Sequence, residues 1–201
     1  MAKVKAKKSF GQHFLVDEAV SERIADMVLG YGADTPLGRL PIVEIGPGTG
    51  ALTRWLDASG RELVAVELDR ALLPVLAETM ADYDNFTLIE GDVMALDLAA
   101  VTAEKFPGLP AVLCANLPYN ITTPFLTACV EARCFDSLTV LIQKEVAQRI
   151  CAAPGTADYG AFTLLMQYYT RPELLFTVPN TCFLPAPKVT SAVIRCATRT
   201  A

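Results

Sequence analysis

The stretch Leu40-Pro-Ile-Val-Glu-Ile-Gly-Pro-Gly-Thr-Gly50 leads from an apolar run directly into three closely spaced glycines. Residues 40–45 predict a buried strand, and residues 49–58 predict a helix. The glycines between them permit a tight turn and let a ligand approach the backbone closely. A strand, a glycine-rich turn and a helix in this order indicate an α/β fold, with a ligand site beyond the carboxyl end of the strand.

The same alternation of strand and helix continues along the chain. Asp17 is a candidate N-cap for a first helix that ends near Gly30 or Gly32. Further strands are expected at residues 63–67, 86–90, 111–115, 138–142, 174–178 and 189–196, and further helices at residues 71–80, 124–131, 144–151 and 162–169. This pattern predicts a Rossmann-like, mostly parallel seven-stranded sheet with helices on both faces and an antiparallel strand at its edge.

Composition limits the class of protein. The chain has 201 residues, of which 52% are hydrophobic, so it can bury a sizeable core, and we expect one domain over residues 1–201. No apolar stretch approaches the roughly 20 residues of a membrane span, and the N-terminus has no apolar secretory core, so we expect a cytoplasmic protein. The six cysteines lack C-x-x-C spacing and there is one histidine, which predicts reduced, mostly buried thiols and no metal site.

Charge is distributed unevenly. Residues 1–30 carry five basic and four acidic side chains, residues 31–130 carry five and thirteen, and residues 131–201 carry seven and five, for a net charge of −5. The acidic middle suits a cationic cofactor, while both ends can contact phosphates. The N-terminus carries four lysines, Lys3, Lys5, Lys7 and Lys8. They either contact phosphates or form a solubilising tail.

Acidic side chains occur at the ends of the first three predicted strands. Glu67 can accept hydrogen bonds from both hydroxyls of a ribose, and Asp92 can accept the amino group of an adenine. Taken singly, Glu67 can be a solvated loop carboxylate and Asp92 a turn residue. Together with Glu44 and the glycine turn, they suit a cofactor with an adenosine end and a cationic end, which is the shape of S-adenosylmethionine.

The glycine turn also fits a second class of cofactor. Gly46, Gly48 and Ala51 fit the looser form of the dinucleotide-binding fingerprint, so a nicotinamide-dependent dehydrogenase is an alternative. That alternative gives no reason for the segment Asn116-Leu-Pro-Tyr119.

The segment Asn116-Leu-Pro-Tyr119 follows the apolar run of residues 111–115. The Asn116 side-chain oxygen and the Leu117 carbonyl can each accept one N–H of an amine, and Tyr119 can stack on the ring that bears it. No general base is needed, since the proton becomes acidic once the nitrogen is alkylated. The segment therefore indicates methylation of a ring amine, on a base that is splayed out of its stack.

With these residues in place, the chain resembles the class I methyltransferases, and among them the ribosomal RNA small subunit adenine N6,N6-dimethyltransferases. The matching blocks lie in the same order over nearly the whole chain: Lys8-Ser-Phe-Gly-Gln-His-Phe-Leu15, Val43-Glu-Ile-Gly-Pro-Gly48, Val66-Glu-Leu-Asp69, Gly91-Asp92, Asn116-Leu-Pro-Tyr-Asn-Ile121 and Phe183-Leu-Pro-Ala-Pro-Lys-Val-Thr-Ser191. Two positions depart from the common pattern, Ala186 where proline is common and Thr190 where aspartate is common.

The resemblance assigns roles to individual residues. The implied cofactor-binding residues are His13, Leu15, Glu44, Gly46, Gly48, Glu67, Asp92, Val93 and Asn116, with His13 a contact rather than a base. The implied catalytic residues are Asn116, Leu117, Tyr119 and Phe183, with Tyr119 and Phe183 expected to stack on the two faces of the target adenine.

The resemblance also implies an activity, N6,N6-dimethylation of adenines in small-subunit ribosomal RNA with S-adenosylmethionine as cofactor, by a monomer whose partner is the small ribosomal subunit. The usual C-terminal helical domain is expected to be absent, which would weaken engagement of the subunit. Two alternatives stay open: a large-subunit adenine methyltransferase of the macrolide-resistance type, and a non-catalytic assembly or transcription factor that keeps the fold.

Overall fold

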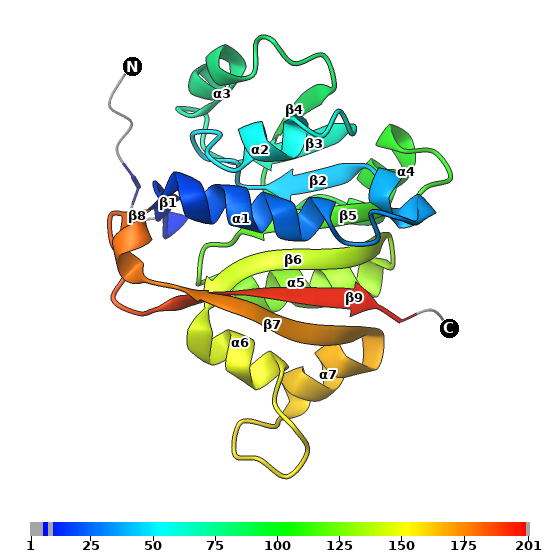
Figure 1. Ribbon diagram of the computed structural model, residues 1–201, viewed down its shortest axis with the longest axis vertical. Coiled ribbons are helices and arrows are strands. Elements are labelled where there is room, and N and C mark those ends of the chain that lie inside the picture. The colour runs from blue at the N-terminus through cyan, green and yellow to red at the C-terminus, as the bar shows by residue number, and fades with distance from the viewer. Residues whose placement is uncertain (1–5, 8–9, 200–201) are drawn as a thin grey trace.

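The computed structural model describes residues 6–7 and 10–199 (Figure 1). Lys3, Lys5 and Lys8 of the predicted basic arm lie outside the described residues. A seven-stranded sheet in the order β4-β3-β2-β5-β6-β9-β7 forms the centre. Its strands are β2 (Ile42–Ile45), β3 (Leu63–Glu67), β4 (Phe86–Glu90), β5 (Ala111–Asn116), β6 (Phe135–Gln143), β7 (Thr170–Val178) and β9 (Ser191–Thr198). The predicted class I methyltransferase architecture is confirmed.

The middle of the sheet is parallel and covered on both faces. Strand β2 pairs in parallel with β3 and β5, with Ile42 opposite both Leu63 and Val112. All residues of β2 and β3 are buried, which explains why these strands are almost continuously apolar. Since parallel strands end at the same edge, the residues that follow β2, β3, β4 and β5 are brought together there.

The antiparallel strand lies one place in from the edge. The last strand, β9, pairs antiparallel with both β6 and β7, so β7 forms the edge and the predicted antiparallel pairing at this edge is confirmed. Burial explains the order, because Ala192, Val193 and Ile194 of β9 are fully buried. Strand β7 has several exposed side chains and contains Pro172, which an edge strand tolerates.

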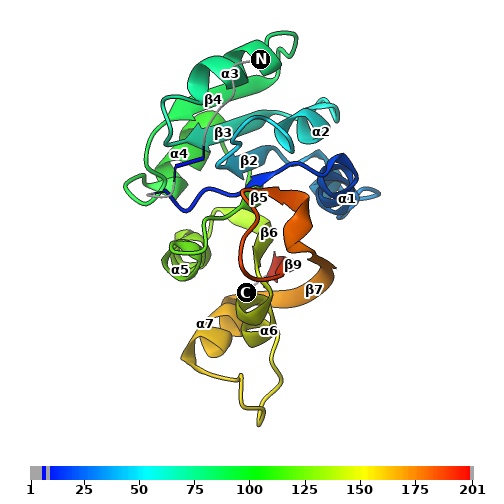
Figure 2. The ribbon, with the colours of Figure 1, turned by 90° about the vertical axis from the view of Figure 1, so that its left-hand side faces the viewer.

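Helices cover both faces of the sheet, as Figure 2 shows. On one side lie α1 (Glu18–Leu29) and α2 (Thr53–Asp57), and on the other α4 (Leu98–Lys105), α5 (Thr122–Ala132), α6 (Lys144–Ile150) and α7 (Ala161–Tyr169). Helix α3 (Leu73–Thr79) links β3 to β4. The buried side chains fall into two clusters, one containing Leu56 and the other containing Phe125.

Local signals explain where helices begin. Asp17 caps α1 as predicted, with its carboxylate accepting from the Val20 amide at 3.1 Å. The helix expected from residue 49 begins at Thr53, because the preceding glycines adopt positive φ angles and keep that segment in turns. Helix α4 was not predicted, although Asp97 caps it by accepting from the Ala100 amide at 2.9 Å.

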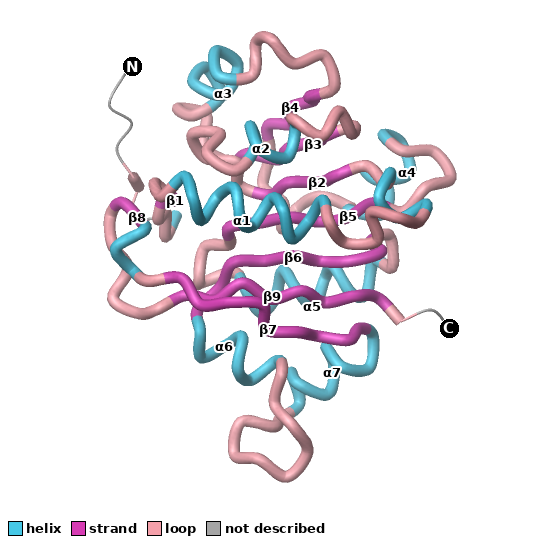
Figure 3. The backbone as a smooth tube through the Cα atoms, in the orientation of Figure 1, coloured by secondary structure: helices cyan, strands magenta, loops and turns pink. Residues whose placement is uncertain are grey.

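A small second sheet joins distant parts of the chain. Strand β1 (Phe14–Leu15) pairs antiparallel with β8 (Phe183–Leu184), with Leu15 opposite Phe183. Figure 3 shows the two segments side by side at one end of the molecule. The pairing of β1 with β8 ties the N-terminal segment to the connection between β7 and β9. The 3₁₀ helices η2 (Pro36–Arg39) and η3 (Asn180–Cys182) lie in connecting segments.

The thiols are free, and the sequence expectation that most are buried is confirmed: Cys114, Cys129, Cys182 and Cys196 are buried and Cys134 and Cys151 are partly so. Among residues 6–7 and 10–199, no helix is long and apolar enough to cross a membrane. The same residues contain no group of three or more histidine, cysteine or acidic side chains arranged to hold a metal ion.

Candidate cofactor and base-binding site

A cavity of about 290 Å³ opens at the carboxyl ends of β2, β3, β4 and β5. Residues 10–15 line it from the N-terminal side, and residues 116–121 from the end of β5. The structure brings almost all of the predicted site residues to its wall: His13, Leu15, Glu44, Gly46, Gly48, Glu67, Asp92, Val93, Asn116, Leu117 and Tyr119. Their roles toward a ligand remain predictions.

The glycine turn presents bare backbone to the cavity. Gly46 and Gly48 have φ angles of +67° and +63°, which side chains with a Cβ rarely adopt. A Cβ built at Gly48 would lie 3.3 Å from a ring carbon of Phe14 in the N-terminal segment. The turn and the segment therefore meet closely only because residue 48 lacks a side chain.

The Glu67 carboxylate is held by two backbone amides. Its Oε2 accepts from the Gly48 amide at 3.1 Å and its Oε1 from the Asp69 amide at 2.8 Å. Burial raises the pKa of Glu67, while these hydrogen bonds lower it. Because a carboxylate oxygen has two lone pairs, each oxygen can still accept a hydroxyl of a ligand.

Glu44 is buried at the cavity wall without a full set of partners. It is 2% exposed, and its Oε2 has no hydrogen-bond partner among the described residues. Burial raises the pKa of Glu44 to about 8, and the charge of Glu67 adds to the effect. An orphaned buried carboxyl beside a cavity fits a ligand that brings a positive charge.

Asp92 is a turn residue that also lines the cavity. Its Oδ1 accepts from the Met94 amide at 2.9 Å, as in a turn after β4. Asp92 and the buried Val93 nevertheless line the cavity, where the other carboxylate oxygen is left to accept a donor.

The side chain of Asn116 has a fixed orientation at the end of β5. Its Nδ2 donates to the His13 carbonyl at 3.1 Å. Since a carbonyl can only accept, the amide nitrogen must face His13, and Oδ1 remains as a free acceptor. The backbone of Leu117 is held by donation of its amide to the Leu141 carbonyl at 3.1 Å.

Tyr119 and His13 form an aromatic pair. Their ring centroids are 5.6 Å apart at an interplanar angle of 26°, and the Tyr119 hydroxyl hydrogen bonds with Ser191 Oγ at 2.7 Å. His13 Nδ1 donates to the Pro185 carbonyl at 2.7 Å, which assigns the proton to Nδ1. One face of Tyr119 is thus covered by an imidazole from the N-terminal segment.

Phe183 is the one predicted site residue that the structure does not bring to the cavity wall, and its stacking role stays a prediction. Phe183 is 4% exposed and packs in the cluster that contains Leu15, and it does not line the cavity. The cause is the pairing of β8 with β1, which places Phe183 opposite Leu15. In this structure the ring beside Tyr119 belongs to His13.

Several wall residues were missed by sequence reasoning. Phe14, Leu68 and Met94 contribute apolar surface to the cavity, and Leu68 and Met94 are exposed by 46% and 40%. Leu68 directly follows Glu67 and Met94 comes two residues after Asp92, which was an available signal for these two, since a cofactor with an apolar ring needs such neighbours.

Two solved structures share this fold. The 23S rRNA methyltransferase ErmE is 27% identical, with a TM-score of 0.77 over 93% of this chain and 70% of that one. A dimethyladenosine transferase from Plasmodium falciparum is 24% identical, with a TM-score of 0.75 over 93% of this chain and 64% of that one, and supports the fold alone.

Relatives in sequence are closer. The ribosomal RNA small subunit methyltransferase A of Alkaliphilus metalliredigens is 45% identical over 96% of this chain, and that of Geobacillus thermodenitrificans is 46% identical over 94%. The chain spans 66% and 63% of their respective lengths. The sequence profile of the family described as ribosomal RNA adenine dimethylase matches residues 3–201. By sequence, fold and the strand-end motifs, the chain belongs to the ribosomal RNA adenine dimethylase family.

Proposed function

We propose that this chain binds S-adenosylmethionine and transfers methyl groups to the N6 amine of adenines in small-subunit ribosomal RNA, twice on each adenine. The observation that carries the proposal is the fixed amide of Asn116 beside the strand-end carboxylates. Its Oδ1 is the free acceptor that an amine needs, in the same cavity that Glu67 and Glu44 line.

The residues of the cavity fit the cofactor from end to end. When bound, S-adenosylmethionine supplies an electrophilic methyl group on its sulfonium. In this proposal Glu67 accepts the ribose hydroxyls, Asp92 accepts the adenine amine, and Glu44 balances the positive charge; their free acceptor oxygens support these roles. Gly46 and Gly48 provide the close backbone approach.

The base is held by two acceptors and a ring. Asn116 Oδ1 and the Leu117 carbonyl, to which no described residue donates, each accept one N–H of the adenine amine, which turns the nitrogen lone pair toward the methyl group. Stacking on Tyr119 contributes about 1–3 kcal/mol. After the first transfer one N–H remains, so one of the two acceptors is sufficient for the second.

A large-subunit substrate is the second candidate, favoured by the 27% identity and close fold of the 23S rRNA methyltransferase ErmE. The 45% and 46% identity to small-subunit methyltransferases favours the first. The third alternative, a non-catalytic factor, is disfavoured because the Asn116-to-Tyr119 segment is intact and lines the cavity.

The test compares methyl incorporation from labelled S-adenosylmethionine into unmethylated small and large subunits at low salt. We expect N6,N6-dimethyladenine in small-subunit RNA, a loss of at least about 100-fold for Asn116→Ala, the scale of removing one preorganised hydrogen-bonding group, and a much smaller loss for the neighbouring Asn120→Ala. Incorporation into large-subunit RNA alone would favour the second candidate. Unchanged incorporation by Asn116→Ala would refute the role given to that amide.

A further inference from the structure

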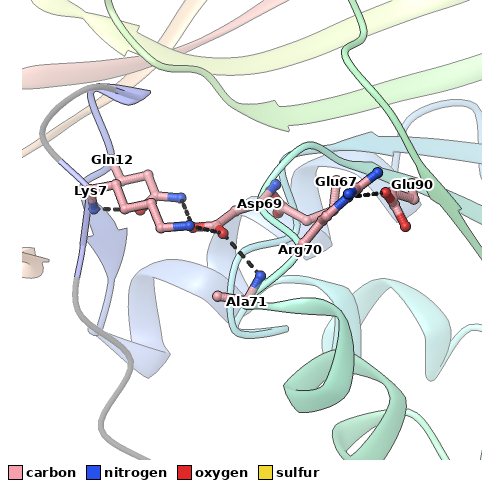
Figure 4. Close-up of polar contacts among 7 residues, drawn as sticks. All are labelled: Lys7, Gln12, Glu67, Asp69, Arg70, Ala71 and Glu90. Atoms are coloured by element: carbon pink, nitrogen blue, oxygen red, sulfur yellow. Dashed lines mark hydrogen bonds and ion pairs between the residues drawn. The ribbon is translucent and has the colours of Figure 1, made fainter.

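One carboxylate connects the N-terminal segment to the loop after β3. Asp69 Oδ1 accepts from Lys7 Nζ at 2.5 Å, and Oδ2 accepts from Gln12 Nε2 at 3.0 Å, as Figure 4 shows. Oδ1 also accepts from the Ala71 amide at 3.0 Å. Asp69 is 1% exposed. A buried carboxylate that takes donors from a segment 57 to 62 residues earlier in the chain is a tertiary anchor as well as a turn residue.

The donors from the segment act as a unit. The Lys7 amide donates to Gln12 Oε1 at 2.7 Å, and the Phe10 amide donates to the Lys7 carbonyl at 3.0 Å. Both polar ends of the Gln12 side chain are therefore engaged, one within the segment and one on Asp69. The other end of the segment is tied by the pairing of Leu15 with Phe183.

Asp69 also contacts the residue that we assign to the ribose. Its backbone amide donates to Glu67 Oε1 at 2.8 Å. A single residue thus orients the Glu67 carboxylate through its backbone and holds the N-terminal segment through its side chain. The segment so held lines the same cavity through residues 10–15.

We propose that Asp69 is a positioning residue that latches residues 10–15 over the cofactor, so that the bonds from Lys7 and Gln12 slow cofactor release. The inference rests on the proposed function for the identity of the ligand. It assigns no chemical step to Asp69, which does not line the cavity.

The test measures ligand release and segment opening instead of turnover. S-adenosylhomocysteine is displaced from the chain by excess S-adenosylmethionine in a stopped-flow experiment, and amide hydrogen exchange is followed in peptides covering residues 10–16 and 111–116. Asp69→Asn places an amide donor either against Lys7 and the Ala71 amide or against Gln12, and we expect release to speed up roughly tenfold, the scale of one hydrogen bond to a charged group. Exchange should rise in residues 10–16 and not in residues 111–116.

Three further variants separate a latch from a general loss of structure. Lys7→Met should speed cofactor release by a few-fold, which is less than for Asp69→Asn because the Lys7 side chain is 44% exposed. Lys7→Arg keeps the positive charge and should release the cofactor at the wild-type rate. Arg70→Gln is the matched control, since it breaks an ion pair to Glu90 in the same loop without touching the segment (Figure 4).

The outcomes are distinct. Wild-type release and exchange in both Asp69→Asn and Lys7→Met, or an equal effect of Arg70→Gln, would overturn the latch. If exchange in Asp69→Asn also rises in residues 111–116, that variant has lost structure more generally, and the lysine variants decide. Release that is faster in Lys7→Met and normal in Lys7→Arg supports the latch, and wild-type release in Lys7→Met overturns it. If the wild-type chain binds neither ligand, the proposed function fails, while exchange of residues 10–16 in the unliganded variants still tests the latch.

Discussion

Cofactor binding should release a proton from Glu44. Its side chain is buried beside the cavity with an unpartnered oxygen, and burial raises its pKa to about 8. At pH 7 a group with that pKa is ~0.9 protonated. A bound cation favours the ionised carboxylate, so S-adenosylmethionine should expel ~0.9 proton per site, and its affinity should rise as the pH increases from 6 to 8.

The assay is titration calorimetry at pH 7 in phosphate and in Tris, whose ionisation enthalpies differ. The dependence of the measured enthalpy on the buffer gives the number of protons released. Wild type should release ~0.9 proton more than Glu44→Gln, which cannot ionise, and the exposed Glu62→Gln should match wild type. Equal proton release by wild type and Glu44→Gln would refute the reasoning, because the ligand's own titration is common to both.

Three other perturbations have expected results. In the unliganded chain the pKa of Glu44 is raised, so its contribution to the free energy of unfolding is full below about pH 4.5 and is lost as the pH rises through about 8. Urea unfolding should show the free energy of unfolding falling over this pH range in wild type and falling less steeply in Glu44→Gln. Gly48→Ala forces a Cβ into a positive φ and against Phe14, so it should lower the free energy of unfolding by about 1–2 kcal/mol and weaken S-adenosylmethionine binding in the same calorimeter. Tyr119→Phe loses the bond to Ser191 but keeps the ring, so methyl incorporation should fall only a few-fold, against roughly 10- to 100-fold for Tyr119→Ala.

Sequence reasoning succeeded where the signal was local. Strands β3 and β4 have the predicted bounds, because buried parallel strands are short apolar runs between turn residues. The Asp17 cap was also predicted from a local signal, an aspartate directly before an apolar helical pattern. Helix α4 was missed although Asp97 is an equally good N-cap, since its alanine-rich sequence has little apolar periodicity.

The features of the site that the sequence did not reveal depend on long-range pairing. Two-residue strands carry no periodicity, so nothing local predicts that Phe14–Leu15 pairs with Phe183–Leu184. That pairing buries Phe183 and brings His13 onto Tyr119. The sequence assigns Asp69 no role beyond its place in the block Val66-Glu-Leu-Asp69, because its partners Lys7 and Gln12 are far away in sequence.

The N-terminal segment joins the cofactor half of the site to the base half. Its Gln12 reaches Asp69, whose amide holds Glu67, and its His13 carbonyl fixes the amide of Asn116. If the segment lifts, Nδ2 of Asn116 loses its partner and the amide is free to rotate, so the acceptor is no longer aimed at the amine. On the proposed function, closure over the cofactor would therefore also set the orientation of Asn116, the group that we propose holds the substrate. Segment opening should accordingly lower the rate of methyl transfer as well as the lifetime of the bound cofactor.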